Sequence, residues 1–137
     1  MLIVEEEQVT PTHFHWRKAE DIINRGGGNL VVQLYNSTND EQLADTDVTV
    51  SLDGVRRTVP AGDCVTLNPG ESIFLPPRLY HKFWGEKGKG KLLVGEVSKV
   101  DDAYNDNRFL EPVGRLPEIE EDEAPRHILF LEYPRVR

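Results

Sequence analysis

The sequence has little cysteine: Cys64 is the single one among 137 residues. One cysteine cannot form an internal disulfide, so nothing in the chain requires an oxidising compartment. The sequence also has no run of about 20 apolar residues, so we expect no transmembrane helix. The opening stretch, residues 1–8, turns acidic almost at once and lacks the basic start of a signal peptide. These features predict a cytoplasmic protein without a membrane partner.

Positive charge is scarce as well. Lys and Arg total 16 against 24 Asp and Glu, which gives a formal net charge of −8. A surface that coats phosphates needs the opposite sign, so we expect neither nucleic acid nor an anionic membrane as the main partner. With 38% hydrophobic and 29% charged residues, the composition is that of a globular protein. The length fits one domain over residues 1–137.

Short apolar stretches alternate with Gly, Pro, Asn and Asp, a pattern typical of an all-β sandwich or barrel such as a jelly roll. Asp53-Gly54 predicts a tight hairpin, and Asp40–Asp45 could form one helical turn. The acidic stretch Pro117–Pro125 predicts a solvated loop. The expected strands are Leu2–Glu5, Val9–Trp16, Asp21–Asn24, Leu30–Tyr35, Val48–Leu52, Val55–Val59, Cys64–Leu67, Ser72–Leu75, His81–Trp84, Leu92–Val97 and His127–Glu132.

Histidines provide the first chemical signal. His13 and His15 are two residues apart, so on a strand both imidazoles point to one face and could hold one metal ion. Strict alternation would put Glu20 on the other face, so the chain must bend if Glu20 joins them. An H-x-H pattern by itself is weak evidence for a metal, because structural histidines on strands are common. We expect His127 to be a surface or partly buried imidazole rather than a ligand.

Two motifs together resemble the cupin superfamily. The first has the form H-x-H, then E, then G, and is matched by His13, His15, Glu20 and Gly27. The second runs from Gly70 through Pro76 to His81, with Arg78 in place of the usual glycine and Gly85 in place of the usual asparagine. The resemblance implies a jelly-roll β-barrel in which His13, His15, Glu20 and His81 hold a divalent metal. Three imidazoles and a carboxylate suit Mn²⁺, Fe²⁺, Co²⁺, Ni²⁺ or Zn²⁺.

Longer stretches are similar to the D-lyxose isomerase family. They are HFHWRKAEDIINRGGGNLVVQLYN and LPPRLYHKFWGEKGKGKLLVGEVSKVDDAYNDNRF. This resemblance covers the chain from about Val9 to Tyr133. It implies interconversion of D-lyxose with D-xylulose, and of D-mannose with D-fructose, with Mn²⁺ as the usual metal. Relatives carry a longer N-terminal region before the metal motif, so we expect part of a pocket lid or dimer contact to be missing.

The resemblance also implies acid–base residues. Lys18 matches a lysine used in catalysis, and Glu111 is the better match to the catalytic carboxylate; a solvated Lys18 is the alternative. Glu96 interrupts an apolar strand and could face either the site or the solvent. We predict that Glu96, Asp106 and Arg108 bind the sugar, although the last two would also suit an ordinary surface loop.

Three other functions remain open at this point. The same ligands would serve another cupin metalloenzyme, such as an Fe²⁺ dioxygenase or a different sugar isomerase or epimerase. A sugar-binding cupin without catalysis would need neither Lys18 nor Glu111, and a purely structural barrel would need no metal. Edge strands in such folds commonly pair between copies, so we expect a homodimer.

Overall fold

The structure of the protein is a computed structural model. It describes residues 1–99, 102, 105–113, 122–124, 126–128 and 133–134. In this part of the chain, no helix has the length and apolarity that a membrane crossing requires.

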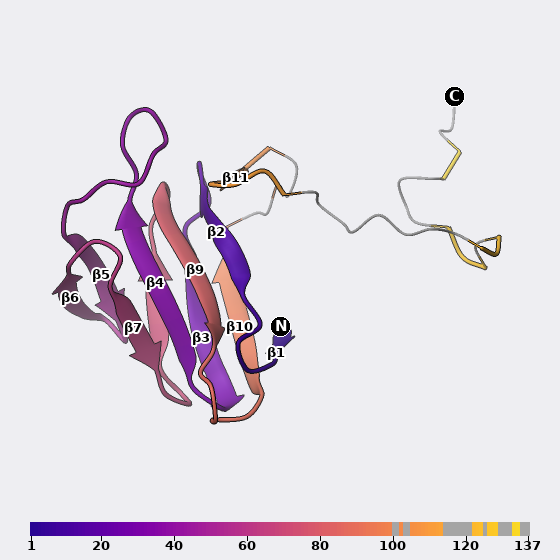
Figure 1. The fold of residues 1–137 in the computed structure, drawn as a ribbon, viewed down its shortest axis with the longest axis horizontal. Coiled ribbons are helices and arrows are strands. Elements are labelled where there is room, and N and C mark those ends of the chain that lie inside the picture. The colour runs from indigo at the N-terminus through magenta and orange to yellow at the C-terminus, as the bar shows by residue number, and fades with distance from the viewer. Residues whose placement is uncertain (100–101, 103–104, 114–121, 125, 129–132, 135–137) are drawn as a thin grey trace.

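Two antiparallel sheets face each other (Figure 1). The six-stranded sheet has the order β1-β10-β3-β8-β5-β6, and the five-stranded sheet has the order β11-β2-β9-β4-β7. Neighbours in each sheet are mostly distant in sequence, as expected of a jelly roll. The strands are β1 (Leu2–Val4), β2 (Thr10–His15), β3 (Glu20–Gly27), β4 (Leu30–Asn36), β5 (Val48–Leu52), β6 (Val55–Val59), β7 (Cys64–Leu67), β8 (Ser72–Leu75), β9 (Leu79–Gly85), β10 (Leu92–Ser98) and β11 (Asn107–Phe109).

The core lies between the two sheets and follows from alternation along the strands. On β4, Leu30, Val32 and Leu34 are fully buried, while the residues between them are only partly covered. On β3, the inward Ile22 is likewise fully buried. The buried residues of both sheets form one cluster. A two-layer sandwich of this kind needs only one apolar face per sheet, which matches the short alternating stretches of the sequence.

The expected all-β jelly-roll class is confirmed, with one refinement. The first ten predicted strands all have counterparts, and Asp53 and Gly54 both have positive φ values, 47° and 80°, in the β5–β6 turn. Positive φ at both positions is what a tight primed turn requires. The strand pairing of the described residues, however, leaves two separate sheets rather than a closed barrel.

Three local expectations come out differently. The predicted helical turn at Asp40–Asp45 is wrong: this stretch belongs to a loop in which Leu43 forms an isolated bridge with Ser37. The short strand β11 was not expected, because its sequence lies in a polar run. In the predicted strand His127–Glu132, the first two residues are not in a strand, and 129–132 lie outside the described residues.

Gly27 shows why the first cupin motif ends in glycine. Its φ is +94°, a left-handed conformation that side chains rarely adopt. A Cβ at this position would lie 2.3 Å from the backbone oxygen of Lys91. The close approach occurs beside the irregular β3–β10 pairing, where the register shifts between Leu93 and Val94. Gly27 therefore allows β10 to lie tightly against the strand that carries Glu20.

Candidate metal centre

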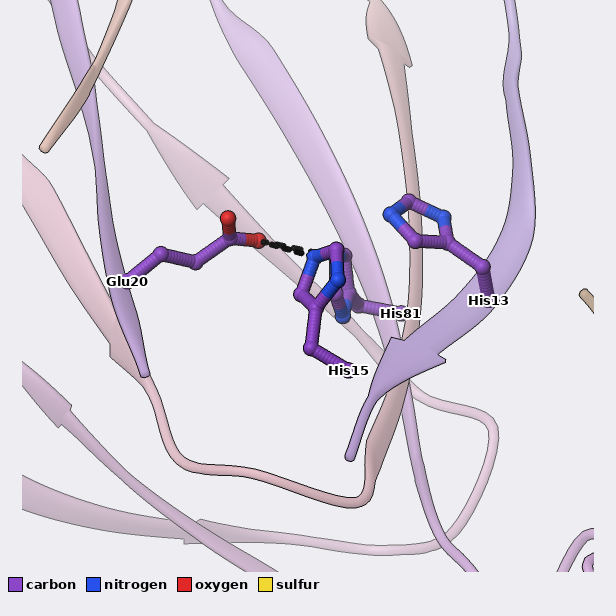
Figure 2. A group of neighbouring side chains, drawn as sticks. All are labelled: His13, His15, Glu20 and His81. Carbon is purple, nitrogen blue, oxygen red and sulfur yellow. Dashed lines mark ion pairs between the residues drawn. The ribbon is translucent and has the colours of Figure 1, made fainter. Parts of the chain in front are cut away.

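Four side chains converge from opposite layers of the sandwich (Figure 2). His13 and His15 come from β2, and His81 comes from the neighbouring β9, where it pairs directly with His13. These three belong to the five-stranded sheet, whereas Glu20 begins β3 in the six-stranded sheet. The alternation of faces along one strand therefore does not predict the direction of the Glu20 side chain relative to His15. The chain changes sheet between His15 and Glu20, and the two inner faces bring them together.

The cluster is compact and buried. The candidate ligand atoms of His13, His15, Glu20 and His81 all lie within 4.8 Å of one another. Glu20 Oε1 lies 3.3 Å from His15 Nε2 and 3.2 Å from His81 Nε2. Metal–ligand distances of about 2.0–2.2 Å allow ligand separations up to roughly 4.4 Å, so a small side-chain rotation would bring all four atoms around one ion.

Hydrogen bonds with the backbone fix the protonation of two imidazoles. His13 Nδ1 lies 2.7 Å from the carbonyl oxygen of Pro11, and His81 Nδ1 lies 3.0 Å from that of Leu79. A carbonyl oxygen only accepts, so each Nδ1 carries the proton and donates it. In the neutral imidazole, Nε2 then presents a lone pair. A hydrogen bond from Nδ1 to a backbone carbonyl commonly orients a metal-binding histidine.

The same assignment leaves a deficit of positive charge at the centre of the cluster. His81 Nε2 and Glu20 Oε1 are then two acceptors 3.2 Å apart. Among the described residues, the buried atoms His15 Nδ1, His15 Nε2 and His81 Nε2 have no hydrogen-bond partner. Buried polar atoms in folded proteins rarely lack a hydrogen-bond partner. A proton or a cation between these atoms would satisfy them, and the donor set fits a divalent transition metal.

The pKa values agree with a deprotonated site. Burial, and next the nearby His81, lower the pKa of His13 to about 3, so this ring is neutral near pH 7. Burial alone would raise the pKa of Glu20, but hydrogen bonds from His15 and His81, which require a proton on the imidazole nitrogen that faces the carboxylate, reverse the effect and hold that pKa well below its ordinary value. A neutral imidazole and an ionised carboxylate are the forms that bind a metal.

Lys18 is part of the same centre. It lies in the connection between β2 and β3, it is buried, and its Nζ lies 2.9 Å from Glu20 Oε2. The alternative of a solvated Lys18 is therefore wrong. Lys18, Glu20 and the histidines His13 and His15 line a cavity of about 280 Å³. That volume is just below the usual range for small-molecule sites, roughly 300–1,000 Å³.

Glu96 faces this cavity from β10. It pairs with the fully buried Ile22, which places it on the inner face, while Val97 is 62% exposed on the outer face. Glu96 remains exposed at the cavity wall, where partial desolvation of its carboxylate, and next the negative charge of Glu20, raise its pKa above the ordinary value. Of the two orientations that the sequence left open for Glu96, the structure has the one toward the site.

Comparison with known proteins gives the family. A sequence profile of the D-lyxose isomerase family matches residues 1–133. The chain belongs to the D-lyxose isomerase family. Two curated relatives are named D-lyxose/D-mannose isomerase. The one from Serratia proteamaculans is 61% identical over 130 residues, and the one from Escherichia coli O157:H7 is 57% identical over 134 residues.

Both alignments cover nearly all of this chain, 95% and 98%. They cover only 57% and 59% of the two relatives. The chain therefore spans less than three fifths of the length of the D-lyxose/D-mannose isomerases that it matches.

Among the cavity residues that sequence reasoning missed, two come from β11. Asn107 and Phe109 line the cavity from β11, where they pair with His15 and His13 respectively. The Phe109 and His13 rings lie 5.3 Å apart between centroids. Alternate residues of a strand point to the same face, so Asn107 and Phe109 could have been placed on the side of the histidines. That step requires knowing that residues 107–109 form a strand, which the polar sequence does not indicate.

The other predicted site residues lie outside the cavity lining. Asp106 is buried and bound to backbone amides, described below. Arg108 points to the opposite face of β11, where its Nε lies 2.7 Å from Glu41 Oε2. Glu111 is exposed just beyond β11. The structure thus gathers Lys18 and Glu96 with the four candidate ligands and leaves Asp106, Arg108 and Glu111 apart.

Proposed function

We propose that the protein is a metal-dependent aldose–ketose isomerase that interconverts D-lyxose and D-xylulose, and also D-mannose and D-fructose. The observation that carries this proposal is the buried cluster of three imidazoles and Glu20, with Lys18 in contact, in a chain of the D-lyxose isomerase family. The names of two relatives support the substrates.

We propose His13, His15, Glu20 and His81 as the metal ligands and Mn²⁺ as the metal. The donor set also suits Co²⁺, Ni²⁺, Fe²⁺ and Zn²⁺, and the choice of Mn²⁺ rests on the family resemblance. A bound divalent ion would act as a Lewis acid that polarises the sugar's carbonyl and hydroxyl oxygens.

Proton transfer falls to side chains of the chain itself. Moving the carbonyl between C1 and C2 requires one group to take a proton from the sugar and one to return it. We propose Lys18 for one of these steps, because its ammonium group lies at the cavity wall and is fixed by Glu20. A dication bound nearby would repel the ammonium group, which would help Lys18 to give up a proton.

Two glutamates compete for the role of carboxylate partner. The family resemblance favours Glu111, whereas the cavity lining favours Glu96. Glu96→Gln and Glu111→Gln separate the two, since the variant that loses turnover while keeping its metal identifies the partner. Asn107 and Phe109 line the same cavity, where Asn107 would offer a carboxamide to sugar hydroxyls and Phe109 an apolar wall.

Assembly and location stay predictions. We propose a homodimer, since the two sheets end in the edge strands β1, β6, β7 and β11, which have a partner strand on one side only among the described residues. We also propose a cytoplasmic location and a sugar as the small-molecule partner. Size-exclusion chromatography with light scattering tests the dimer.

The decisive experiment measures D-xylulose formed from D-lyxose by metal-stripped protein, with and without Mn²⁺. We expect product only with Mn²⁺, none from His13→Ala, and reduced turnover in Lys18→Met with its metal content intact. Folded protein that binds Mn²⁺ and converts neither D-lyxose nor D-mannose would refute the proposal. Oxygen consumption with an organic substrate would instead identify a dioxygenase.

A further inference from the structure

One aspartate, Asp106, binds three consecutive backbone amides. Its carbonyl oxygen accepts from Trp16 N at 3.1 Å. Its carboxylate accepts from Arg17 N through Oδ1 at 2.8 Å and from Lys18 N through Oδ2 at 2.9 Å. The side chain is 5% exposed. Both carboxylate oxygens are therefore engaged with backbone amides in a buried setting, where charge-assisted hydrogen bonds are strong.

These amides belong to the segment in which the chain crosses between the sheets. β2 ends at His15 and β3 begins at Glu20, so residues 16–19 connect the histidine strand to the glutamate strand. The segment is also held at its ends: His15 O accepts from Arg78 N at 2.7 Å, and Ala19 O accepts from Lys99 N at 3.3 Å. Asp106 binds its middle, directly at the backbone of Lys18.

The hydrogen bonds from these amides to Asp106 fix the position of the Lys18 Cα atom. Lys18 has four rotatable side-chain bonds, so a change in the backbone at its Cα displaces its ammonium group. In the structure that ammonium group lies 2.9 Å from Glu20 Oε2 at the cavity wall. Misplacing a catalytic group by about 1 Å can cost roughly 100-fold in rate.

We propose that Asp106 is a positioning residue, which sets the Lys18 ammonium group against Glu20 by binding the backbone amides of Arg17 and Lys18. This inference rests on the proposed function and replaces the predicted role of Asp106 in sugar binding. The β11 segment would then contribute in two ways: Asn107 and Phe109 line the cavity, and Asp106, just before the strand, holds the segment that carries Lys18 by hydrogen bonds.

The test compares Asp106→Asn with a control variant. Asparagine has nearly the same shape but offers one acceptor oxygen, and its NH₂ group would face the second backbone N–H. The control is Glu6→Gln. Glu6 also bridges two backbone amides with its two oxygens, Gly88 N at 3.0 Å and Gly90 N at 2.5 Å. It does so at the β9–β10 turn, at the other end of the sandwich from β11 (Figure 1).

Both variants are measured for kcat and KM with D-lyxose, for bound Mn²⁺ per chain, and by NMR for the Lys18 side-chain signals and the exchange of the Arg17 and Lys18 amides. For Asp106→Asn we expect kcat to fall about 10–100-fold, with KM within about threefold and Mn²⁺ retained. We also expect faster exchange of the two amides and shifted Lys18 signals. Glu6→Gln should change none of these.

Two results would overturn the inference. Unchanged kcat in Asp106→Asn, with the amide protection lost, would mean that Lys18 does not depend on this anchor. A raised KM with unchanged kcat would return Asp106 to direct sugar binding. If the wild-type protein shows no isomerase activity, the proposed function fails by itself; unchanged Lys18 signals in Asp106→Asn would then overturn the positioning role, and shifted ones would support it.

Discussion

The pair formed by Lys18 and Glu20 predicts an asymmetric double-mutant cycle in the metal-stripped protein. The two residues are 7% and 3% exposed, and their charged atoms lie 2.9 Å apart. At an effective dielectric constant of about 20, their Coulomb attraction is about 6 kcal/mol before the cost of desolvation. The perturbations are Glu20→Gln, Lys18→Met and the double variant.

The two single substitutions should differ in cost because Glu20 contacts two imidazoles as well as Lys18. Glu20→Gln removes the charge from all three contacts and breaks a buried ion pair, which costs about 3–5 kcal/mol of unfolding free energy. Lys18→Met removes the ion pair alone and leaves Glu20 in contact with His15 and His81, so we expect a cost of about 1–3 kcal/mol. The double variant should be more stable than the sum implies, with a coupling of about 2 kcal/mol.

The assay is equilibrium urea unfolding in a chelating buffer, followed by the fluorescence of Trp16 and Trp84. Equal m-values across the four proteins justify comparing their unfolding free energies. The reasoning is refuted if the two costs add within about 0.5 kcal/mol, or if Lys18→Met is the more damaging single change. Repeating the cycle with Mn²⁺ then reports how far metal binding replaces the lysine as the countercharge.

Four further outcomes are expected. Mn²⁺ at 100 times its dissociation constant should stabilise the protein by about 2.7 kcal/mol, raising Tm by roughly 10 °C in a thermal melt, and His13→Ala should abolish the shift. Because the pKa of Glu96 is raised in the folded state, its ionised form destabilises the fold at neutral pH, and Glu96→Gln should increase the unfolding free energy of metal-stripped protein there. This increase should shrink as the pH falls toward about 4.3, where Glu96 is protonated in both states, and an increase that stays constant would contradict the prediction. Asn107→Ala should raise KM for D-lyxose roughly tenfold with metal content unchanged, whereas an unchanged KM would exclude a sugar contact. Gly27→Ala should cost more than about 2 kcal/mol in urea unfolding, since its Cβ would meet a backbone oxygen at 2.3 Å, and a neutral result would mean that β10 can shift.

Local patterns in the sequence were sufficient for the strands and for the gathering of the histidines. The H-x-H spacing places His13 and His15 on one face whatever lies around them, because alternation is a property of the strand itself. The second motif adds His81, and the structure pairs it with His13. These parts depend on short-range geometry, which a sequence displays directly.

What the sequence could not supply are relations between segments far apart in the chain. Glu20 reaches the histidines by facing them from the other sheet, and β11 exists because it pairs with β2, about 90 positions earlier. The sequence of this segment resembles a polar loop, in which the polar side chains Asp106 and Arg108 are the natural candidates for sugar binding. The pairing of β11 with β2 instead turns Asn107 and Phe109 toward the cavity. Arg78 is a similar case: its φ of 64° explains why the motif usually has glycine, and its guanidinium group lies over Trp16, 5.0 Å from the ring centroid.

The division of the four candidate ligands between the two sheets links the site to the thickness of the sandwich. Three ligands are fixed to one layer and the fourth to the other, so the distance between the layers sets how closely the carboxylate can approach the imidazoles. That distance is determined by the volume of the core side chains, including Ile22 and Leu34, neither of which is a ligand. A core substitution could therefore tune the preference for a smaller or larger ion while every ligand stays in place. Metal selectivity in such a sandwich would then depend partly on the residues of its hydrophobic core.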